Sequence, residues 1–554
     1  MLAVLALSLP TASADTFPAG AVIDQAAVID ITPEGFESVA QLIPALLPSS
    51  LPLGELSGGY DGVWGQCWLG GYEYSVAGLT VRLEVADARI VPGNGVLDVT
   101  ADLLVYVNDA SDTFDLYTEL ECIGDTCYGY VEPFTVTFST TMALAVTTDG
   151  SGARVLDATI GTPELSYSLE SDAIHLDDCA IGTIEEILGY VGLSIYDLIL
   201  GQLDGVLESA VSDIAPELEA AIEGAFASAT ISQDIALGGA TAHLDLYPSA
   251  VGITPAGVRL TMSGGMSADA AAVCISAYDP GGSEKTTSDA PGIGVAPSGV
   301  DDAFHAGIAL SDDFANQALY ALWRAGLLCY TLEPGGSIPL DTGIFNALTG
   351  DVFADLFPES QPVMLRTVPK VAPTAIFDGE HSVDLALEDL GVQFFAELDG
   401  RQARIVTIAL TGAAGADLAF DATTGELGVE IDLDASAFTP TAEGNEFAPD
   451  ENATIEAAFS GGVQSVIDTV VGGLLEGLTF PLPGFSGIGV TDLQVAPSGD
   501  WLGLYAWLGP VAYEGSGCSS EDGGCSGGCT VGGTAVPGPL FWGVAALVLM
   551  RRRR

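Results

Sequence analysis

At 554 residues, the chain exceeds the about 250–300 residues at which a single hydrophobic core stops growing, so we expect two folded domains. Hydrophobic residues make up 48% of the sequence, which excludes a chain too polar to form cores. With 75 Asp and Glu against 14 Lys and Arg, the formal net charge is -61, which disfavours electrostatic binding to nucleic acid or anionic headgroups. We interpret the acidic shell as keeping an apolar, glycine-rich protein soluble or as suiting a salty medium. A specific cation-binding role is the less favoured alternative.

The first residues have the pattern of an export signal. The apolar run from Met1 to Pro10 is followed by Ala12-Ser-Ala14, which has the A-x-A form of a cleavage site. No basic segment precedes the run, so a translation start upstream of Met1 stays open. We therefore expect residues 1–14 to be a signal peptide, whole or shortened at its start.

Residues 21–240 are expected to form a first domain. A strand at 27–33 leads into a helix at 33–47, because the apolar period changes from two to about 3.6. One face of that helix carries Phe36, Val39, Leu42 and Ile43. Period-two alternation predicts strands at 79–85, 95–107, 134–147 and 154–165. Helical spacing over 181–226 predicts a long helix, and this order of elements is typical of an α+β fold.

Around Thr241 the order of elements restarts, so residues 241–513 are expected to form a second, related domain. A strand at 305–311 leads into a helix that starts at Asp312 with a Ser/Asp cap and ends at Gly326. The apolar face of this helix consists of Phe314, Ala318, Leu319, Leu322 and Trp323. Further predictions are strands within 363–433, a late helix at 453–475, and a surface insertion at 280–302.

The end of the chain carries a specific local pattern. Residues 514–536 are rich in Gly and contain Cys518, Cys525 and Cys529, and residues 537–554 combine an apolar run with four closing arginines. This order resembles the MYXO-CTERM type of bacterial sorting signal. The resemblance implies a membrane protease that cuts near the Gly/Cys segment and leaves the protein at the cell surface. An ordinary tail anchor is the alternative, and both hypotheses place the body outside the cytoplasm.

Three stretches of the second half carry a second resemblance. They are the strand and helix from Ile308 to Leu328, the tetrapeptide Leu356-Phe-Pro-Glu, and Phe480-Pro-Leu-Pro with the strand that follows it. Their order and spacing resemble the C-terminal domain of the bactericidal/permeability-increasing and lipopolysaccharide-binding protein family. Val28-Ile-Asp-Ile-Thr-Pro-Glu-Gly-Phe is a weaker match to the start of that fold. The resemblance implies two elongated barrels, each a sheet wrapped around a long helix, joined by a central sheet in a boomerang shape.

In that family, apolar grooves hold the acyl chains of lipids, so the resemblance implies that the protein binds lipids and leaves open whether it also transfers them. The candidate groove residues are Phe36, Val39, Leu42, Ile43, Phe314, Leu319, Leu322 and Trp323. The family's endotoxin affinity is attributed to basic residues at the tip of the first domain, and this chain has few arginines and no lysine there. We therefore expect phospholipid or neutral lipid as ligand. A structural or adhesive surface protein that keeps the fold is the alternative.

No motif for catalysis or a cofactor stands out. Residues 21–513 lack G-x-S-x-G, H-E-x-x-H, a Walker loop, and G-x-G-x-x-G after a strand, and the four histidines of the chain are not paired at ligand spacing. Acidic pairs such as Asp312-Asp313 occur outside any EF-hand pattern and are interpreted as solvated surface. We therefore expect no enzyme activity, no metal and no cofactor besides bound lipid.

The six cysteines of the body are expected to form disulfides, since the chain is predicted to be exported. Cys122 and Cys127 would close a tight loop between strands. A Cys67–Cys179 bond would resemble the family's conserved bridge, and Cys274–Cys329 would staple the second domain. The sequence alone does not choose among the pairings that six cysteines allow.

Overall fold

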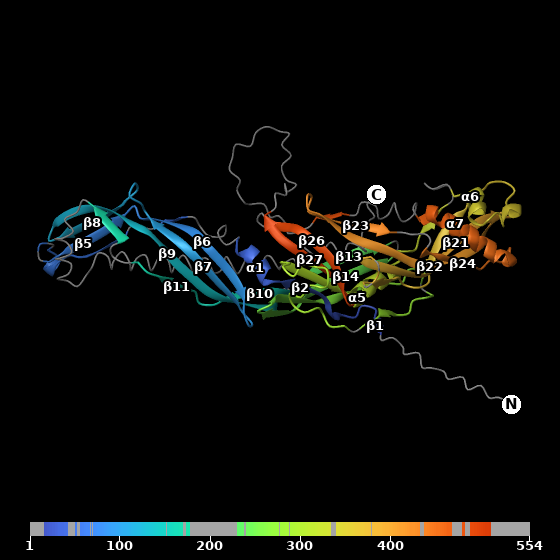
Figure 1. The fold of residues 1–554 in the computed structure, drawn as a ribbon, viewed down its shortest axis with the longest axis horizontal. Coiled ribbons are helices and arrows are strands. Elements are labelled where there is room, and N and C mark those ends of the chain that lie inside the picture. The colour runs from blue at the N-terminus through green and yellow to red at the C-terminus, as the bar shows by residue number, and fades with distance from the viewer. Residues whose placement is uncertain are drawn as a thin grey trace, which may run out of the picture.

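The computed structural model describes residues 16–510 apart from a set of gaps and some single positions that include Cys67. The gaps are 42–49, 53–55, 170–172, 178–229, 238–239, 334–339, 433–436, 468–478 and 482–487. The described part is mostly antiparallel sheet with few helices, and three large sheets follow one another along the long axis (Figure 1). The outer two sheets are curled like half-barrels. The expected helix at 181–226, the signal peptide and the tail beyond residue 513 lie outside the described residues.

The N-terminal sheet has ten strands and forms one end of the molecule (Figure 1). In spatial order its main path is β3 (Ser50–Pro52), β6 (Thr80–Pro92), β7 (Leu97–Val107), β9 (Ile123–Thr148), β8 (Phe114–Leu120), β5 (Tyr72–Ala77) and β4 (Leu56–Tyr60). Three further strands, β10 (Arg154–Ile160), β11 (Glu164–Tyr167) and β12 (Ile174–Asp177), pair with β9. β6 is longer than predicted because a register shift between Val85 and Asp87 interrupts the alternation that marks a strand.

The central sheet draws its seven strands from both halves of the chain. Their order is β13 (Ile231–Leu237), β14 (Ala240–Thr254), β15 (Gly257–Ala268), β2 (Ile23–Ile31), β17 (Ala306–Ser311), β27 (Trp501–Pro510) and β26 (Ile488–Ser498). The first long strand, β2, therefore lies in the middle, hydrogen-bonded to β15 on one side and β17 on the other. The predicted boundary between residues 240 and 241 falls inside this sheet.

The C-terminal sheet has eight strands. They are β18 (Thr331–Leu332), β19 (Met364–Pro369), β21 (Val383–Leu398), β22 (Arg401–Asp421), β23 (Glu426–Asp432) and β25 (Thr479–Pro481), with β20 (Thr374–Ile376) beside β21 and β24 (Thr439–Glu443) beside β22. Helices α6 (Thr342–Leu348) and α7 (Asn452–Ile467) pack against each other at this end, near the short turns η3 (Ala354–Leu356) and η5 (Pro449–Glu451). A core of aromatic rings fills the space between them: Phe345, Phe353, Phe357, Phe394 and Phe459.

Helix α5 (Asp312–Ala325) confirms the sequence prediction in detail. The Ser311 hydroxyl accepts a hydrogen bond from the backbone N–H of Phe314 at 3.2 Å, and Gly326 ends the helix with a φ of 98°. Most of the helix is buried on all sides, because it lies among the central sheet, β20 and β16 (Gly282–Glu284). β16 pairs with β1 (Thr16–Pro18), so part of the predicted insertion at 280–302 forms a small strand.

Helix α1 (Pro33–Ala40) leaves the central sheet through a capped turn. The Thr32 hydroxyl accepts from the backbone N–H of Gly35 at 3.2 Å, and Pro33 occupies the first helical turn. The helix packs closely on the chain at His305, so a Cβ atom at Gly35 would overlap the His305 carbonyl oxygen.

Gly35→Ala is therefore expected to lower the free energy of unfolding by about 1–3 kcal/mol, because α1 must move off the central sheet. Thermal denaturation followed by circular dichroism measures the loss. Gly150→Ala is the matched control, since its Cβ would meet nothing within 4 Å. An equal melting temperature for the two variants would contradict the close packing of α1.

The described cysteines are all in disulfides. Cys274 and Cys329 are bonded to each other with Cα atoms 6.2 Å apart, which joins the segment after β15 to the segment after α5. Cys122 and Cys127 are disulfide-bonded as well. Cys67, Cys179 and the three cysteines of the tail lie outside the described residues. Within the described ranges no helix is long and apolar enough to cross a membrane, and the apolar run expected at 537–554 lies beyond them.

Candidate functional site

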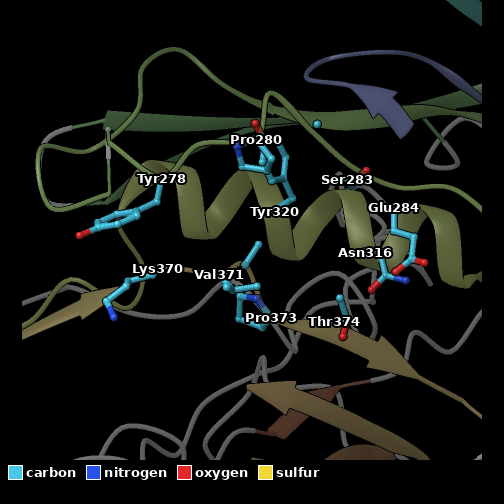
Figure 2. A pocket seen from close by; sticks show the side chains of 12 residues that line it. Tyr278, Pro280, Ser283, Glu284, Asn316, Tyr320, Lys370, Val371, Pro373 and Thr374 are labelled. Atoms are coloured by element: carbon cyan, nitrogen blue, oxygen red, sulfur yellow. The ribbon is translucent and has the colours of Figure 1, made fainter. Parts of the chain in front are cut away.

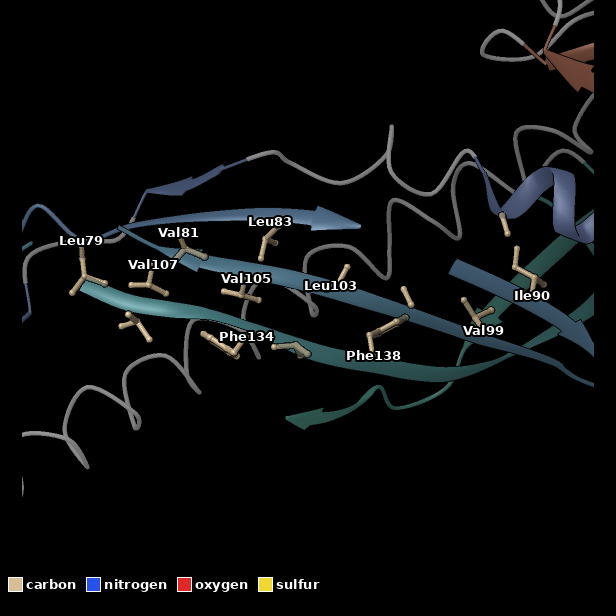
Figure 3. Packing of buried hydrophobic residues seen from close by; sticks show 14 of the residues in the cluster. Leu79, Val81, Leu83, Ile90, Val99, Leu103, Val105, Val107, Phe134 and Phe138 are labelled. Atoms are coloured by element: carbon tan, nitrogen blue, oxygen red, sulfur yellow. The ribbon is translucent and has the colours of Figure 1, made fainter. Parts of the chain in front are cut away.

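One face of the N-terminal sheet carries a continuous row of buried apolar side chains, which we call the inner face. Along β7 every second side chain is buried, from Leu97 to Val107, while the residues between them are exposed or half-buried. Neighbouring strands add to the same row, which Figure 3 shows along β6, β7 and β9. The inner face consists of Leu79, Val81, Leu83, Ile90, Leu97, Val99, Ala101, Leu103, Val105, Val107, Phe134, Val136, Phe138 and Met142.

The chemistry of the inner face is restricted to the burial of apolar groups. Among the described residues, Asp30 is the one charged residue that is buried, and it lies in β2 of the central sheet. The inner face therefore offers aliphatic and phenyl groups along several strands. Each CH₂ group removed from water contributes about 0.8 kcal/mol, so a surface of this kind suits a long hydrocarbon chain.

A second apolar region lies where α5 meets the C-terminal sheet and β27. Its buried centre includes Leu319, Leu427 and Leu504, and a set of half-buried apolar side chains surrounds that centre. These are Ala315, Val383, Leu385, Phe420, Leu493 and Val495. In contrast to the phenylalanine core farther along the sheet, this region leaves apolar surface partly open.

The far end of the N-terminal sheet carries exposed aromatic side chains, which we call the aromatic tip. It consists of the aromatic residues Tyr60, Trp64 and Trp68 together with the aliphatic residues Val63 and Ile123. The side chains are brought together by strand pairing, since Tyr60 lies opposite Tyr72 and Tyr72 lies opposite Leu120, next to the turn at Ile123. Figure 1 places β5 and β8 at the end of the molecule remote from the other sheets.

Trp64 shows that the aromatic tip is not built for folding stability. Trp64 is 90% exposed, and its backbone has the left-handed values φ 58° and ψ 27° within η1 (Val63–Gly65). A non-glycine residue in this conformation costs about 1–2 kcal/mol, and the exposed ring offsets none of that cost. Trp68 and Ile123 are also exposed, at 60% and 78%. Tryptophan and tyrosine rings favour a boundary between water and hydrocarbon, because each combines an apolar body with a polar group.

The structure places the sequence-predicted groove residues in separate cores. Phe36 is buried in the core of the inner face, and Val39 is partly buried against it, while Leu42 and Ile43 lie outside the described residues. Around α5, Phe314 and Leu322 pack on the central sheet and Leu319 packs toward the C-terminal sheet. Trp323 packs with Tyr320, and its indole N–H donates to the carbonyl oxygen of Pro369 at 3.1 Å.

Sequence reasoning missed the aromatic tip, although a signal was present. Tyr60, Trp64 and Trp68 lie within a glycine-rich stretch, where large apolar side chains have no regular core to join. Sequence reasoning also missed the inner face as a surface. The alternation in β7 predicted a strand, but only the pairing with β6 and β9 shows that their apolar sides coincide.

The acidic pair at the start of α5 has a structural role. Thr286 donates its backbone N–H to Asp313 at 2.6 Å and its hydroxyl to Asp312 at 2.7 Å, which attaches the insertion to the helix. Burial raises the pKa of both carboxyl groups above the ordinary aspartate value. The described residues contain no group of three or more potential metal ligands.

Comparisons with known proteins bear on the fold. No protein family model matches the chain, and no curated protein matches it. A crystal structure of lipopolysaccharide binding protein aligns with a TM-score of 0.51 and 16% identity, over 88% of this chain and 100% of that chain. The crystal structure of P47 of Clostridium botulinum E1 aligns over 88% of this chain and 100% of that chain with a TM-score of 0.25 and 8% identity, too low to carry an argument. The chain therefore has a fold like that of lipopolysaccharide binding protein.

Proposed function

We propose that the protein binds lipids, with the acyl chains against the inner face of the N-terminal sheet. The observation that carries this proposal is the row of buried apolar side chains that runs along β6, β7 and β9. A sixteen-carbon chain laid along it would gain on the order of 12 kcal/mol before ordering costs. The half-buried region beside α5 is the candidate for a second acyl site. Likeness to the fold of lipopolysaccharide binding protein supports the same proposal.

The aromatic tip is proposed to dock on the membrane from which lipid is taken or to which it is delivered. Trp64 and Trp68 have the amphipathic character of interfacial anchors. The net charge of -61 opposes contact with anionic lipid, so the favoured surface is zwitterionic or uncharged. This chemistry differs from endotoxin binding through a basic patch.

Location and processing rest on the sequence alone. The export signal and the MYXO-CTERM-like tail support a place at the cell surface or outer envelope, first anchored by residues 537–554. A sorting protease is the proposed partner at the tail. The lack of catalytic motifs supports a non-catalytic role, and the resemblance supports two lipid-holding barrels in a boomerang arrangement.

Native mass spectrometry of the purified body tests the lipid proposal. The expected result is added mass that organic extraction removes and identifies as lipid. A protein that is free of lipid and also fails to take up fluorescent phospholipid would refute the proposal. It would favour a structural or adhesive role, with which the phenylalanine-filled core of the C-terminal sheet is compatible.

A bulky substitution on the inner face tests the location of the acyl chain. Ala101→Trp should abolish phospholipid uptake at the N-terminal sheet, because Ala101 is 5% exposed and faces inward. The matched control is Thr100→Trp, one residue away on the opposite side of β7, which should keep uptake. Fluorescent phospholipid titration measures both variants. Equal uptake would place the acyl chain elsewhere.

A further inference from the structure

Two glutamates face each other close to the aromatic tip, and we call them the glutamate pair. Glu73 in β5 lies directly opposite Glu119 in β8. Successive residues of a strand point to opposite sides of a sheet, so the pair lies on the side away from the inner face, whose core includes Val76 and Leu116. Like charges directly opposite each other destabilise a sheet. The pair therefore costs stability unless a cation lies between the two carboxylates.

The chain itself offers few cations for this place. The basic residues between positions 16 and 153 are Arg82 and Arg89, both in β6. Arg82 lies over the ring of Tyr106, and Arg89 pairs with Asp87. Three strands separate β6 from β5 in the sheet. A cation at the glutamate pair would therefore come from a binding partner.

Another part of the protein shows how two of its carboxylates hold a primary ammonium group. Lys370 lines a cavity beside α5, where Figure 2 shows it. Its Nζ atom donates to Asp389 at 2.8 Å and to Glu443 at 2.7 Å. Burial lowers the pKa of Lys370, but the hydrogen bonds to the two carboxylates outweigh burial, so the pKa is raised. The glutamate pair offers a similar set of acceptors without a lysine.

The surroundings of the glutamate pair leave acceptor atoms for a ligand. Tyr117 donates its hydroxyl to Oε2 of Glu119 at 2.6 Å, which orients that carboxylate. This hydrogen bond is the main cause that raises the pKa of Tyr117, and the charge of Glu73 adds to it. Gly59 and Gly124 flank the pair on the neighbouring strands and contribute no side chain. The exposed carboxylate of Glu73 and the second oxygen of Glu119 therefore remain as acceptors.

The position of the glutamate pair points to a membrane surface as the source of the cation. Glu73 and Glu119 lie one residue behind Tyr72 and Leu120, which belong to the last paired row of the sheet before the tip. One residue of a strand spans about 3.4 Å, and the headgroup layer of a bilayer is about 5–8 Å thick. With the exposed rings of the aromatic tip at the hydrocarbon boundary, both carboxylates lie at the depth of the headgroups.

We propose that Glu73 and Glu119 bind the primary ammonium group of phosphatidylethanolamine in the membrane on which the aromatic tip docks. The inference rests on the proposed docking and adds a choice of headgroup to it. A primary ammonium group has three N–H donors and forms charge-assisted hydrogen bonds with carboxylates, whereas the trimethylammonium group of phosphatidylcholine has no N–H. A metal ion would need further ligands, and the described residues contain no group of three or more potential ligands.

Co-sedimentation of the full chain with vesicles tests the proposal. One set of vesicles consists of phosphatidylcholine, and the other contains equal parts of phosphatidylcholine and phosphatidylethanolamine. We expect the parent protein to bind the mixed vesicles about threefold to tenfold more tightly. Glu73→Gln with Glu119→Gln should bring the ratio of the two affinities to about one. An ethanolamine headgroup with two N-methyl groups, which keeps one N–H, should give an intermediate ratio in the parent protein.

The matched control is Asp115→Asn with Asp177→Asn. Both aspartates lie opposite Tyr128 on the same side of the sheet as the glutamate pair, and Asp115 is roughly 13 Å farther from the tip than Glu119. This variant removes as many charges and should keep the preference for the mixed vesicles. Melting temperatures close to that of the parent protein show that both variants are folded.

The outcomes separate the choice of headgroup from the docking itself. Equal affinity of the parent protein for the two kinds of vesicle would overturn the choice of headgroup and leave the docking of the tip intact. A preference that persists in the glutamine variant would also overturn it, because the different packing of phosphatidylethanolamine would then be the cause. Binding to neither kind of vesicle would overturn both the docking and the inference that rests on it.

Discussion

Replacing Trp64 and Trp68 together by alanine is expected to weaken binding to phosphatidylcholine vesicles by about a hundredfold. Each exposed ring that enters the interface removes on the order of 60–100 Å² of apolar surface from water, which is about 1.5–2.5 kcal/mol. Loss of both rings is therefore expected to lower the affinity for vesicles by about a hundredfold or more. Vesicle co-sedimentation, or light scattering, which does not rely on tryptophan fluorescence, gives the partition coefficients of both proteins between water and vesicles. The fold should be unaffected, since both side chains are largely exposed.

The control for the aromatic tip is Phe447→Ala. Phe447 is an aromatic residue, 45% exposed, on the C-terminal half of the chain. Its loss should leave vesicle binding unchanged, because it lies outside the aromatic tip. Addition of anionic lipid should weaken binding of the parent protein to the vesicles. High salt should restore that binding, because it screens the repulsion. If the two variants lose affinity equally, the tip has no special role in docking.

Asp30→Ala is expected to lower the free energy of unfolding by about 3–5 kcal/mol, the largest effect predicted for stability. Arg259 donates through Nε and Nη2 to the two carboxylate oxygens of Asp30 at 2.7 and 2.6 Å, joining β2 to β15. The side chain of Asp30 is 10% exposed and that of Arg259 is 15% exposed, so the substitution leaves a guanidinium buried without its partner. Urea denaturation followed by circular dichroism measures the loss.

The control replaces both partners by apolar residues of similar size. Burial raises the pKa of Asp30 despite the neighbouring Arg259, so ionisation is harder in the folded chain than in the unfolded chain. The stabilisation linked to this group is complete below its unfolded pKa and decreases as the pH rises through its folded pKa. Asp30→Leu with Arg259→Met should therefore be nearly as stable as the parent at pH 7, or more stable. A double variant as unstable as Asp30→Ala would show that the pair itself stabilises the sheet.

Local sequence rules predicted the elements whose ends are set by local chemistry. Helix α5 is the best example, because Ser311 and Gly326 define its limits without help from the rest of the fold. Strand β9 was predicted only from residue 134, although it starts at Ile123. Gly129 and Pro133 weaken the strand pattern there, and pairing with β8 and β12 overrides that weakness.

The candidate site could be predicted only in part, since it depends on which faces of distant elements coincide. Helical spacing correctly identified Phe314 and Leu322 as buried, but it could not show that α5 is enclosed on most sides by different cores. The pairing of β1 with β16 also had no signal in the sequence, because it joins residues far apart along the chain.

The place of β2 in the central sheet has a consequence for how the protein folds. Ile31 pairs with both Val258 and Ala306, so the early strand β2 has no partner in this sheet until β15 and β17 have emerged. β17 in turn needs β27, close to the end of the described chain. Such distant contacts make folding slow and leave strand edges open meanwhile. Truncation before Trp501 would leave the edge of β17 unpaired and should make the chain aggregate.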